Sequence, residues 1–490
     1  MKKLLTACIL PGLIALGACN KGSHSAQLSY ATDGFGTNPG GTIGKMDAIQ
    51  ENPFIKTKDS AVTTFSVDAD GGSYALVRKA LETSMQLNHY KDAIRTEEFI
   101  NYFTYNYPDP VDGNNIAVNG EVSTCPWNTA HKLVRIGIKG KSVEKANYPA
   151  ANFVLVIDVS GSMSTPDKLE LLKNGFITFV NQMRAEDKIA IVTYAGEDAV
   201  RLLSTPGTKK NEIIAAIKGL GASGSTNGAG GIKRAYQIAN ENFIAGGNNR
   251  IILGTDGDFN VGITNTDELI KLIEEYKARG IYLTTLGVGL GNYNEAMMEK
   301  IANKGDGTYE YLDSEAELQK LFIEEYNKFV TVAKDVKVQV SFNKDLVEEY
   351  RLIGYENRSL TNDDFKDDSK DAGEIGAGQT VTAIYEVKPV ANAAFKLKPS
   401  FGIQFRYKKS ADEASIPLSL DIYDNGNSFA EASEDMRFAS SLAALGAYLR
   451  GSAYTRGVTL SSIKEWASAA TTFDPGGHRK KHLQLLNKVQ

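Results

Sequence analysis

Residues 153–163, with the sequence FVLVIDVSGSM, decide the fold of this 490-residue chain. Their first five residues form a continuous apolar run, typical of a strand that is buried on both faces of a sheet. Similar runs follow at 189–194, 250–254 and 281–288, with amphipathic stretches of helical spacing between them. This alternation predicts an α/β domain over residues 149–332, built on a doubly wound, mostly parallel, Rossmann-like sheet.

Polar side chains follow these predicted strands at their carboxyl ends, where doubly wound sheets bind ligands. The first strand ends in Asp158, Ser160 and Ser162, which alternate on one tight loop. Thr226 precedes a later predicted helix, and Asp256 follows the third run. Small, hard cations prefer carboxylate and hydroxyl oxygens, and Mg²⁺ binds them at roughly 2.0–2.1 Å. We therefore expect these five side chains to hold Mg²⁺, or Mn²⁺ or Ca²⁺ in its place.

The pattern Asp158-x-Ser160-x-Ser162, with Thr226 and Asp256 at these separations, resembles the metal-ion-dependent adhesion site of von Willebrand factor A-type (VWA) domains. The resemblance implies that the two serines coordinate the ion directly and that Thr226 does so directly or through water. It implies that the two aspartates act usually through water, leaving one position open for a Glu or Asp of a partner protein. Binding would then shift the last helix of the domain, expected at 314–332, toward the flanking modules.

Segments on both sides of this domain resemble the bacterial YfbK-like lipoproteins. They include 64–70 (TFSVDAD), 95–103 (RTEEFINYF), 125–128 (CPWN) and 352–358 (LIGYENR). Strand patterns occupy an α+β module at 61–148 and a β-rich module at 333–430, and residues 431–490 have helical spacing. The early strands need partners and the later ones supply them. We therefore expect the VWA domain to be inserted in a β-rich flanking domain, with C-terminal helices; two separate β modules are the alternative.

The N-terminus predicts export and a lipid anchor. A basic start and an apolar stretch make residues 1–18 a signal peptide. Residues 16–19, LGAC, resemble a lipobox, which implies cleavage before Cys19 and its lipidation; an ordinary signal peptide or a buried strand are the alternatives. Residues 19–60 are rich in Gly, Ser, Asn and Thr and predict a flexible tether. In some bacteria an Asp after the lipidated Cys is associated with retention in the inner membrane. This chain has Asn20 there, which favours the outer membrane of a bacterial cell envelope.

Composition and motifs favour a binding protein over an enzyme. The formal net charge of −5 argues against a general nucleic-acid binder. The chain shows no nucleophile elbow and no phosphate-binding loop with its lysine. Ser160 stands where a phosphatase that begins with a strand-end aspartate needs a second acid, which disfavours a Mg²⁺-dependent hydrolase. The remaining alternative is a structural envelope protein in which the metal only stabilises the loops.

Overall fold

The computed structural model describes residues 49–83, 91–195, 197–224, 228–257, 266–290, 293–391, 398–410 and 413–489, which belong to one compact unit. The predicted signal peptide, Cys19 and Thr226 lie outside these ranges. Within the ranges, no helix combines the length and the apolar character that a bilayer-crossing segment needs.

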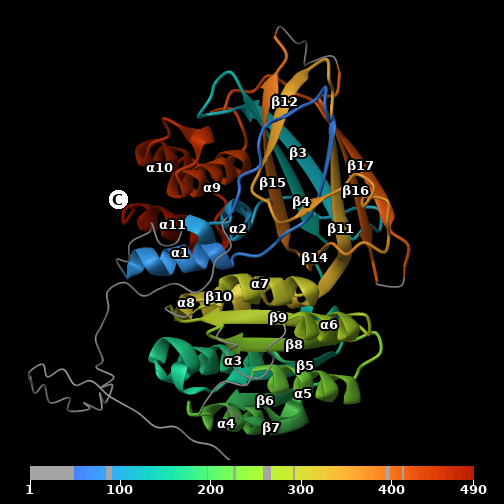
Figure 1. Ribbon diagram of the computed structural model, residues 1–490, viewed down its shortest axis with the longest axis vertical. Helices are drawn as coiled ribbons and strands as arrows, with labels where there is room; N and C mark the ends of the chain where they lie inside the picture. The colour runs from blue at the N-terminus through green and yellow to red at the C-terminus, as the bar shows by residue number, and fades with distance from the viewer. Residues whose placement is uncertain are drawn as a thin grey trace, which may run out of the picture. The chain divides into compact units, whose positions relative to one another are not determined.

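A six-stranded sheet lies at the centre of the inserted domain, in the order β10-β9-β8-β5-β6-β7 (Figure 1). Its strands are β5 (Ala151–Asp158), β6 (Lys188–Ala195), β7 (Glu197–Pro206), β8 (Asn248–Thr255), β9 (Ile281–Val288) and β10 (Tyr309–Leu312). Only the edge strand β7 pairs antiparallel among them. The predicted doubly wound sheet is therefore confirmed. β10 was not predicted, because its four residues are too few to form a recognisable apolar run.

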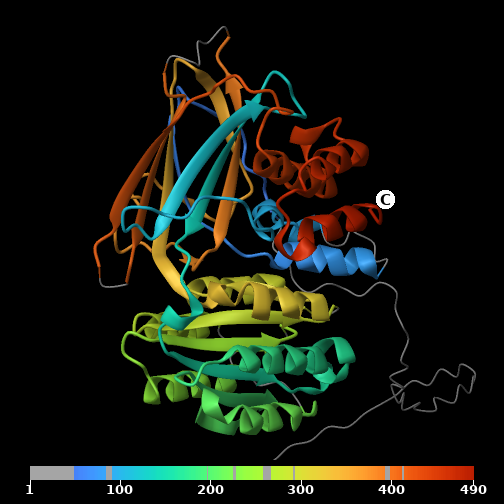
Figure 2. The same cartoon turned by 180° about the vertical axis from the view of Figure 1, so that it is seen from behind.

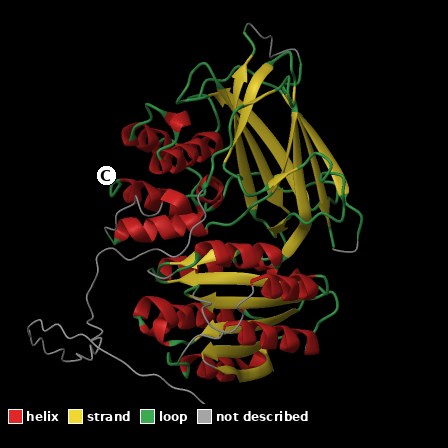
Figure 3. Cartoon of the chain, in the orientation of Figure 1, coloured by secondary structure: helices red, strands yellow, loops and turns green. Residues whose placement is uncertain are grey.

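Helices cover both faces of this sheet (Figure 3). They are α3 (Leu171–Gln182), α4 (Lys210–Lys218), α5 (Gly228–Glu241), α6 (Thr266–Lys277) and α7 (Glu295–Lys304). Alternate residues of β5 serve the two faces, with Phe153 and Leu155 packing toward α3 and α4. Val154 and Val156 pack toward α5 and α6 on the other side. Both faces of the strand are buried, which explains its unbroken apolar sequence.

Two antiparallel sheets form the flanking domain, in the orders β1-β12-β15-β4-β3 and β13-β2-β11-β16-β17, with β14 paired to β11 (Figure 2). Before the inserted domain come β1 (Ile55–Lys56), β2 (Val62–Ser66), β3 (Ile116–Thr124) and β4 (Lys132–Gly140). After it come β11 (Thr331–Phe342), β12 (Val347–Ile353), β13 (Ser359–Leu360), β14 (Gly373–Gly376), β15 (Thr380–Pro389), β16 (Phe401–Lys408) and β17 (Ile416–Ile422).

Strand pairing confirms that the α/β domain is inserted. β2 pairs with β11, and β4 pairs with β15, so each sheet combines strands from both sides of the insertion. The entry and the exit of the domain meet at Asn248. Its backbone N–H donates to the Ala150 carbonyl at 2.9 Å, and its side chain donates to the Phe329 carbonyl at 2.7 Å.

The end of the predicted tether is wrong. Within residues 19–60, Ile55 and Lys56 form β1 and pair with β12. Just before them, the Asn52 side chain donates to the carbonyls of Leu352 at 3.2 Å and Gly354 at 2.8 Å. These backbone contacts attach the segment to the flanking domain, although its sequence lacks an apolar period.

The predicted final helix at 314–332 is also wrong in its length. It divides into α8 (Glu315–Gln319), a π-turn η7 (Lys320–Glu324) and a 3₁₀ turn η8 (Tyr326–Phe329), and β11 begins at Thr331. The partly buried Glu325 carboxylate pairs with the buried Lys320 at 2.7 Å and with the buried Lys328 at 2.6 Å, where the helix breaks. The β-branched residues at 330–332 then favour an extended chain.

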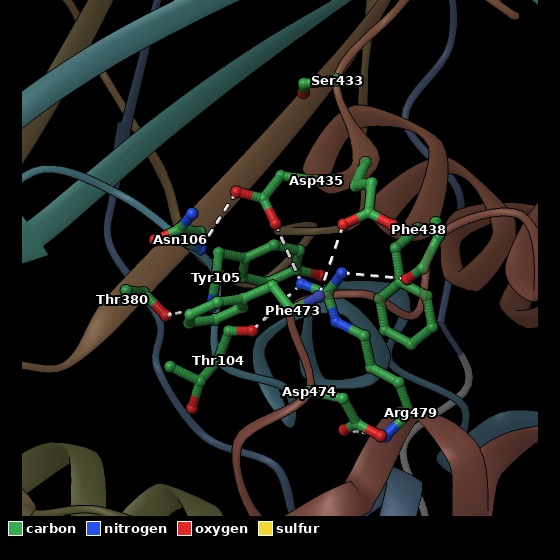
Figure 4. Close-up of polar contacts among 12 residues, drawn as sticks. Thr104, Tyr105, Asn106, Thr380, Ser433, Asp435, Phe438, Phe473, Asp474 and Arg479 are labelled. Atoms are coloured by element: carbon green, nitrogen blue, oxygen red, sulfur yellow. Dashed lines mark hydrogen bonds and ion pairs between the residues drawn. The ribbon is translucent and has the colours of Figure 1, made fainter.

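The predicted C-terminal helices are present and share one core with two earlier helices. The set comprises α1 (Gly72–Glu82), α2 (Thr96–Asn101), α9 (Glu434–Arg450), α10 (Leu460–Ser468) and α11 (His478–Leu486). The buried Arg479 of α11 joins them (Figure 4). Its guanidinium pairs with Asp435 at 2.9 Å and donates to the Thr104 carbonyl at 3.2 Å. The last helix is thus tied to the N-terminal part of the chain.

Buried ion pairs join this helical layer to the inserted domain. Arg95 lies beside three carboxylates, and Arg358 lies beside two. The distances from Arg95 are 3.5 Å to Glu98, 3.1 Å to Glu295 and 2.7 Å to Glu299, and those from Arg358 are 2.8 Å to Asp68 and 3.9 Å to Asp70. Because Glu295 and Glu299 belong to α7, the junction fixes one helix of the inserted domain.

Carboxylates outnumber guanidinium groups at this junction, and burial disfavours their charged forms. Burial raises the pKa of Glu299 from 4.5 to about 7, against the opposing effect of Arg95. Glu97, the buried neighbour of Glu98 in α2, lies at the same junction; burial raises its pKa to about 8, with a further rise from the charge of Glu356. Above pH 4.5, the folded protein therefore keeps protons on Glu97 and Glu299 that the unfolded chain releases.

The free energy of unfolding should fall as the pH rises from 4.5 through the raised pKa values of Glu299 and Glu97. A folded pKa above the unfolded value contributes stability that is complete below pH 4.5, and this stability is lost as the pH rises through about 7 and 8. We expect urea unfolding to give a lower free energy at pH 8 than at pH 5. The variant Glu97→Gln, which is neutral at every pH, should show a shallower decline. An equal decline in the variant and the wild type would contradict this assignment.

Candidate metal centre

The fold brings four of the predicted ligands to one edge of the sheet. Asp158 ends β5, and Ser160 and Ser162 follow it into a 3₁₀ turn, η4 (Gly161–Ser164). Asp256 follows β8, which pairs with β5 in parallel, so the two aspartates leave neighbouring strand ends. The fifth predicted ligand, Thr226, lies outside the described residues.

The loop that bears the two serines is tied to the segment that leads to Thr226. The Gly161 N–H donates to the Gly224 carbonyl at 3.0 Å. The Ser223 N–H donates to the Val159 carbonyl at 2.7 Å. These bonds hold Ser223 and Gly224, which lead to Thr226, against the loop that bears the two serines, as a shared site requires.

Both carboxylate oxygens of Asp158 accept hydrogen bonds from the protein. Oδ1 accepts from the Ser160 N–H at 2.9 Å, while Oδ2 accepts from the Thr255 hydroxyl at 2.9 Å and the Tyr194 hydroxyl at 3.2 Å. Burial raises the pKa of the Asp158 carboxyl, and the hydrogen bonds from Ser160 oppose that rise. An oxygen already engaged in this way is better placed to hold a water molecule than to bind an ion directly.

The two serine hydroxyls have the spacing of neighbouring ligands of one small cation. Ser160 Oγ and Ser162 Oγ lie 3.0 Å apart. Adjacent oxygens of an octahedron with Mg²⁺–O distances of roughly 2.0–2.1 Å lie roughly 2.9 Å apart. Ser160 is buried and Ser162 is exposed, so one side of the pair faces solvent. The donor set therefore fits a divalent ion with an accessible side.

Carboxylates alone do not make this site. Among the described residues, no group of three or more His, Cys, Asp or Glu side chains could hold a metal ion. A metal here would depend on hydroxyl oxygens together with Asp158 and Asp256, as the sequence pattern predicts.

Sequence reasoning missed three side chains that contact the aspartates. Thr255 and Tyr194 hold Asp158, and the Lys168 ammonium lies 2.9 Å from Asp256 Oδ2. Thr255 could have been found, since it immediately precedes Asp256. For Tyr194 and Lys168 the sequence gives no signal, because their contacts depend on how β6 and the start of the first covering helix lie against the sheet.

Asp256 is followed by a close contact with α7. Gly257 has φ +80°, and a Cβ built on it would lie 2.8 Å from the Asn294 backbone nitrogen. Asn294 caps α7, its side chain accepting from the Met297 N–H at 3.2 Å. The next residue, Glu295, is a junction carboxylate. The strand end that carries Asp256 thus touches the helix that the flanking domain fixes.

Replacing Gly257 by alanine should destabilise the protein more than an equivalent change elsewhere. Gly257→Ala combines an unfavourable left-handed backbone with the collision at Asn294, and we expect a loss of about 2 kcal/mol or more in urea unfolding. Gly246→Ala is the control, because Gly246 has φ +70° and open space around its Cβ direction. Equal losses in the two variants would show that the contact with α7 contributes nothing.

Sequence models of three families match the chain. One described as "Uncharacterized protein YfbK, C-terminal" matches residues 327–490. One described as "von Willebrand factor type A domain" matches residues 153–258, and one described as "von Willebrand factor" matches residues 43–135. The first begins within η8, at the end of the inserted domain, and runs through the rest of the chain. The second covers the two aspartates, and the third lies before the insertion.

Three individual proteins are also similar to the chain. The chain is 39% identical over 476 residues to the uncharacterized protein YfbK of Escherichia coli (strain K12), covering 92% of this chain and 81% of that protein. It is 28% identical over 192 residues to human inter-alpha-trypsin inhibitor heavy chain H4, covering 37% of this chain and 20% of that protein. A solved structure, von Willebrand factor type A from Catenulispora acidiphila, is 17% identical with a TM-score of 0.46, covering 79% of this chain and 91% of that one.

Proposed function

This chain belongs to the YfbK family, and from that premise we propose that it binds a partner protein through a divalent cation held by its VWA domain. The observation that carries the proposal is the 3.0 Å separation of the Ser160 and Ser162 hydroxyl oxygens beside two strand-end aspartates. VWA domains commonly hold a divalent metal and contact other proteins. This chain supplies the oxygen ligands that such a metal prefers.

In this proposal the hydroxyl and carboxylate side chains of the site have different roles. Ser160 and Ser162 hold the ion, with Thr226 completing the hydroxyl set. Asp158, fixed by its three hydrogen bonds, orients water and supplies negative charge, as does Asp256. A bound Mg²⁺, Mn²⁺ or Ca²⁺ supplies an electrophilic position that a Glu or Asp of the partner fills. The proposed role is one of binding and not of catalysis, since Ser160 occupies the position where a phosphatase that begins with a strand-end aspartate needs a second acid.

Removing one hydroxyl should abolish metal binding and leave the fold intact. Ser162→Ala deletes an exposed oxygen of the pair, so we expect calorimetry on the full chain to show one Mg²⁺ per wild-type molecule and none for the variant. Ser164→Ala is the control, because Ser164 is an exposed serine of the same turn that the pattern does not use. Asp158→Asn should behave like Ser162→Ala.

The partner is tested with the same variants. Proteins that bind the wild type in Mg²⁺ and are released by a chelator should fail to bind Ser162→Ala. Metal binding that survives in Ser162→Ala would refute the site. Metal binding that raises the melting temperature without any metal-dependent partner would favour a purely stabilising ion.

We also propose that a lipid on Cys19 anchors the protein in a bacterial envelope, in the outer membrane. Residues 16–19, LGAC, after a basic and apolar leader support this. Replacing Cys19 by serine should move the protein from the membrane fraction to the soluble fraction. Cys8→Ser, which lies earlier in the leader, should leave it in the membrane. A Cys19→Ser protein that stays in the membrane until detergent is added would exclude the anchor.

A further inference from the structure

The candidate metal centre contains a buried ammonium group that its sequence pattern does not include. Lys168 lies in the π-helical turn η5 (Pro166–Glu170) and is 8% exposed. Its Nζ lies 2.9 Å from Asp256 Oδ2, and Asp256 is fully buried. A positive side chain therefore pairs directly with one of the two predicted metal-binding carboxylates.

The fold leaves room for this lysine. Gly289 has φ +74°, and a Cβ built on it would lie 2.3 Å from Lys168 Cε and 2.8 Å from Lys168 Cγ. The aliphatic part of the lysine thus runs over a bare stretch of backbone after β9. The Gly289 carbonyl in turn accepts a hydrogen bond from the Tyr311 hydroxyl at 3.0 Å. Because Gly289 has no side chain, the aliphatic part of Lys168 can lie against its backbone, and the ammonium group can then reach Asp256.

The two aspartates consequently differ in charge balance. Asp158 is held by an N–H group and two hydroxyls, which are neutral. Asp256 is paired with a full positive charge. With Lys168 counted, the two carboxylates retain a single negative charge in total. A divalent ion bound among them would keep a net positive charge, whereas two unpaired carboxylates would neutralise it.

We propose that Lys168 is an internal competitor of the divalent cation, which weakens metal binding and leaves the bound ion positive toward an anionic partner. This inference rests on the proposed function and adds its regulation. An ammonium and a divalent ion that are attracted to the same carboxylate repel one another, and burial strengthens that repulsion because little water screens it. The lysine then raises the concentration of divalent ion that is needed to fill the site. The partner's carboxylate offsets the remaining positive charge, so the ion and the partner bind best together.

The test is the affinity of the full chain for Mg²⁺ alone, measured by calorimetry. Lys168→Gln removes the charge and keeps an N–H donor, and Lys168→Met removes both. We expect each to bind Mg²⁺ at least about tenfold more tightly than the wild type. Lys210→Gln is the matched control, because Lys210 in α4 donates to the Asn181 carbonyl at 2.7 Å and lies outside the predicted ligand set. It should bind Mg²⁺ as the wild type does.

Melting temperatures give a second readout if a variant is destabilised by the loss of the Lys168–Asp256 pair. A tighter site gives a larger Mg²⁺-induced rise in melting temperature, so the two Lys168 variants should gain more than the wild type at the same Mg²⁺ concentration. Tighter binding by the two Lys168 variants than by the wild type would support the inference. Equal or weaker binding by folded Lys168 variants, with binding still lost in Ser162→Ala, would overturn the inference alone. No binding by any of these proteins would overturn the proposed function and this inference with it.

Discussion

The pairing of β2 with β11 and of β4 with β15 is the constraint on which the rest of the structure depends. Strands from before and after the VWA domain share sheets, so the domain must leave and return at nearly the same place. Asn248 marks that place by contacting the chain at Ala150 and at Phe329. An inserted domain held at both ends moves less freely than one on a single linker. Its position relative to the flanking domain is further fixed by the buried pairs around Arg95.

The same constraint reaches the candidate metal centre. α7 is held by Arg95 through Glu295 and Glu299, and its cap at Asn294 lies against Gly257, which follows Asp256. Asp256, which pairs with the Lys168 ammonium, is therefore also the aspartate whose strand end contacts the helix that the flanking domain holds. Asp158, in contrast, is held within the VWA domain by Ser160, Thr255 and Tyr194. Asp158 is thus positioned by contacts within the VWA domain, whereas the strand end of Asp256 also contacts the helix that the flanking domain holds.

The sequence predicted what depends on local pattern. Strands buried on both faces, such as β5, have unbroken apolar runs, and the polar residues after them mark the carboxyl edge of the sheet. The insertion of the VWA domain was predicted because the strands before it needed partners that the strands after it could supply. Features that depend on tertiary context could not be predicted. β1 owes its place to backbone bonds, the helix after Ser314 breaks at a buried ion cluster, and the Lys168 contact depends on the bare backbone at Gly289.

The ties between the two ends of the chain bear on the order in which it can fold during synthesis. Thr64 and Gln339, which bond across β2 and β11, are 275 residues apart, and Arg479 joins the N-terminal part later still. The ribosome therefore releases β2 and β4 long before their partners exist, and their edges stay unpaired in the meantime. The VWA domain, whose sheet is complete by Leu312, can close much earlier. A chain cut short before Arg479 would carry a complete VWA sheet on a flanking domain that lacks its last helix.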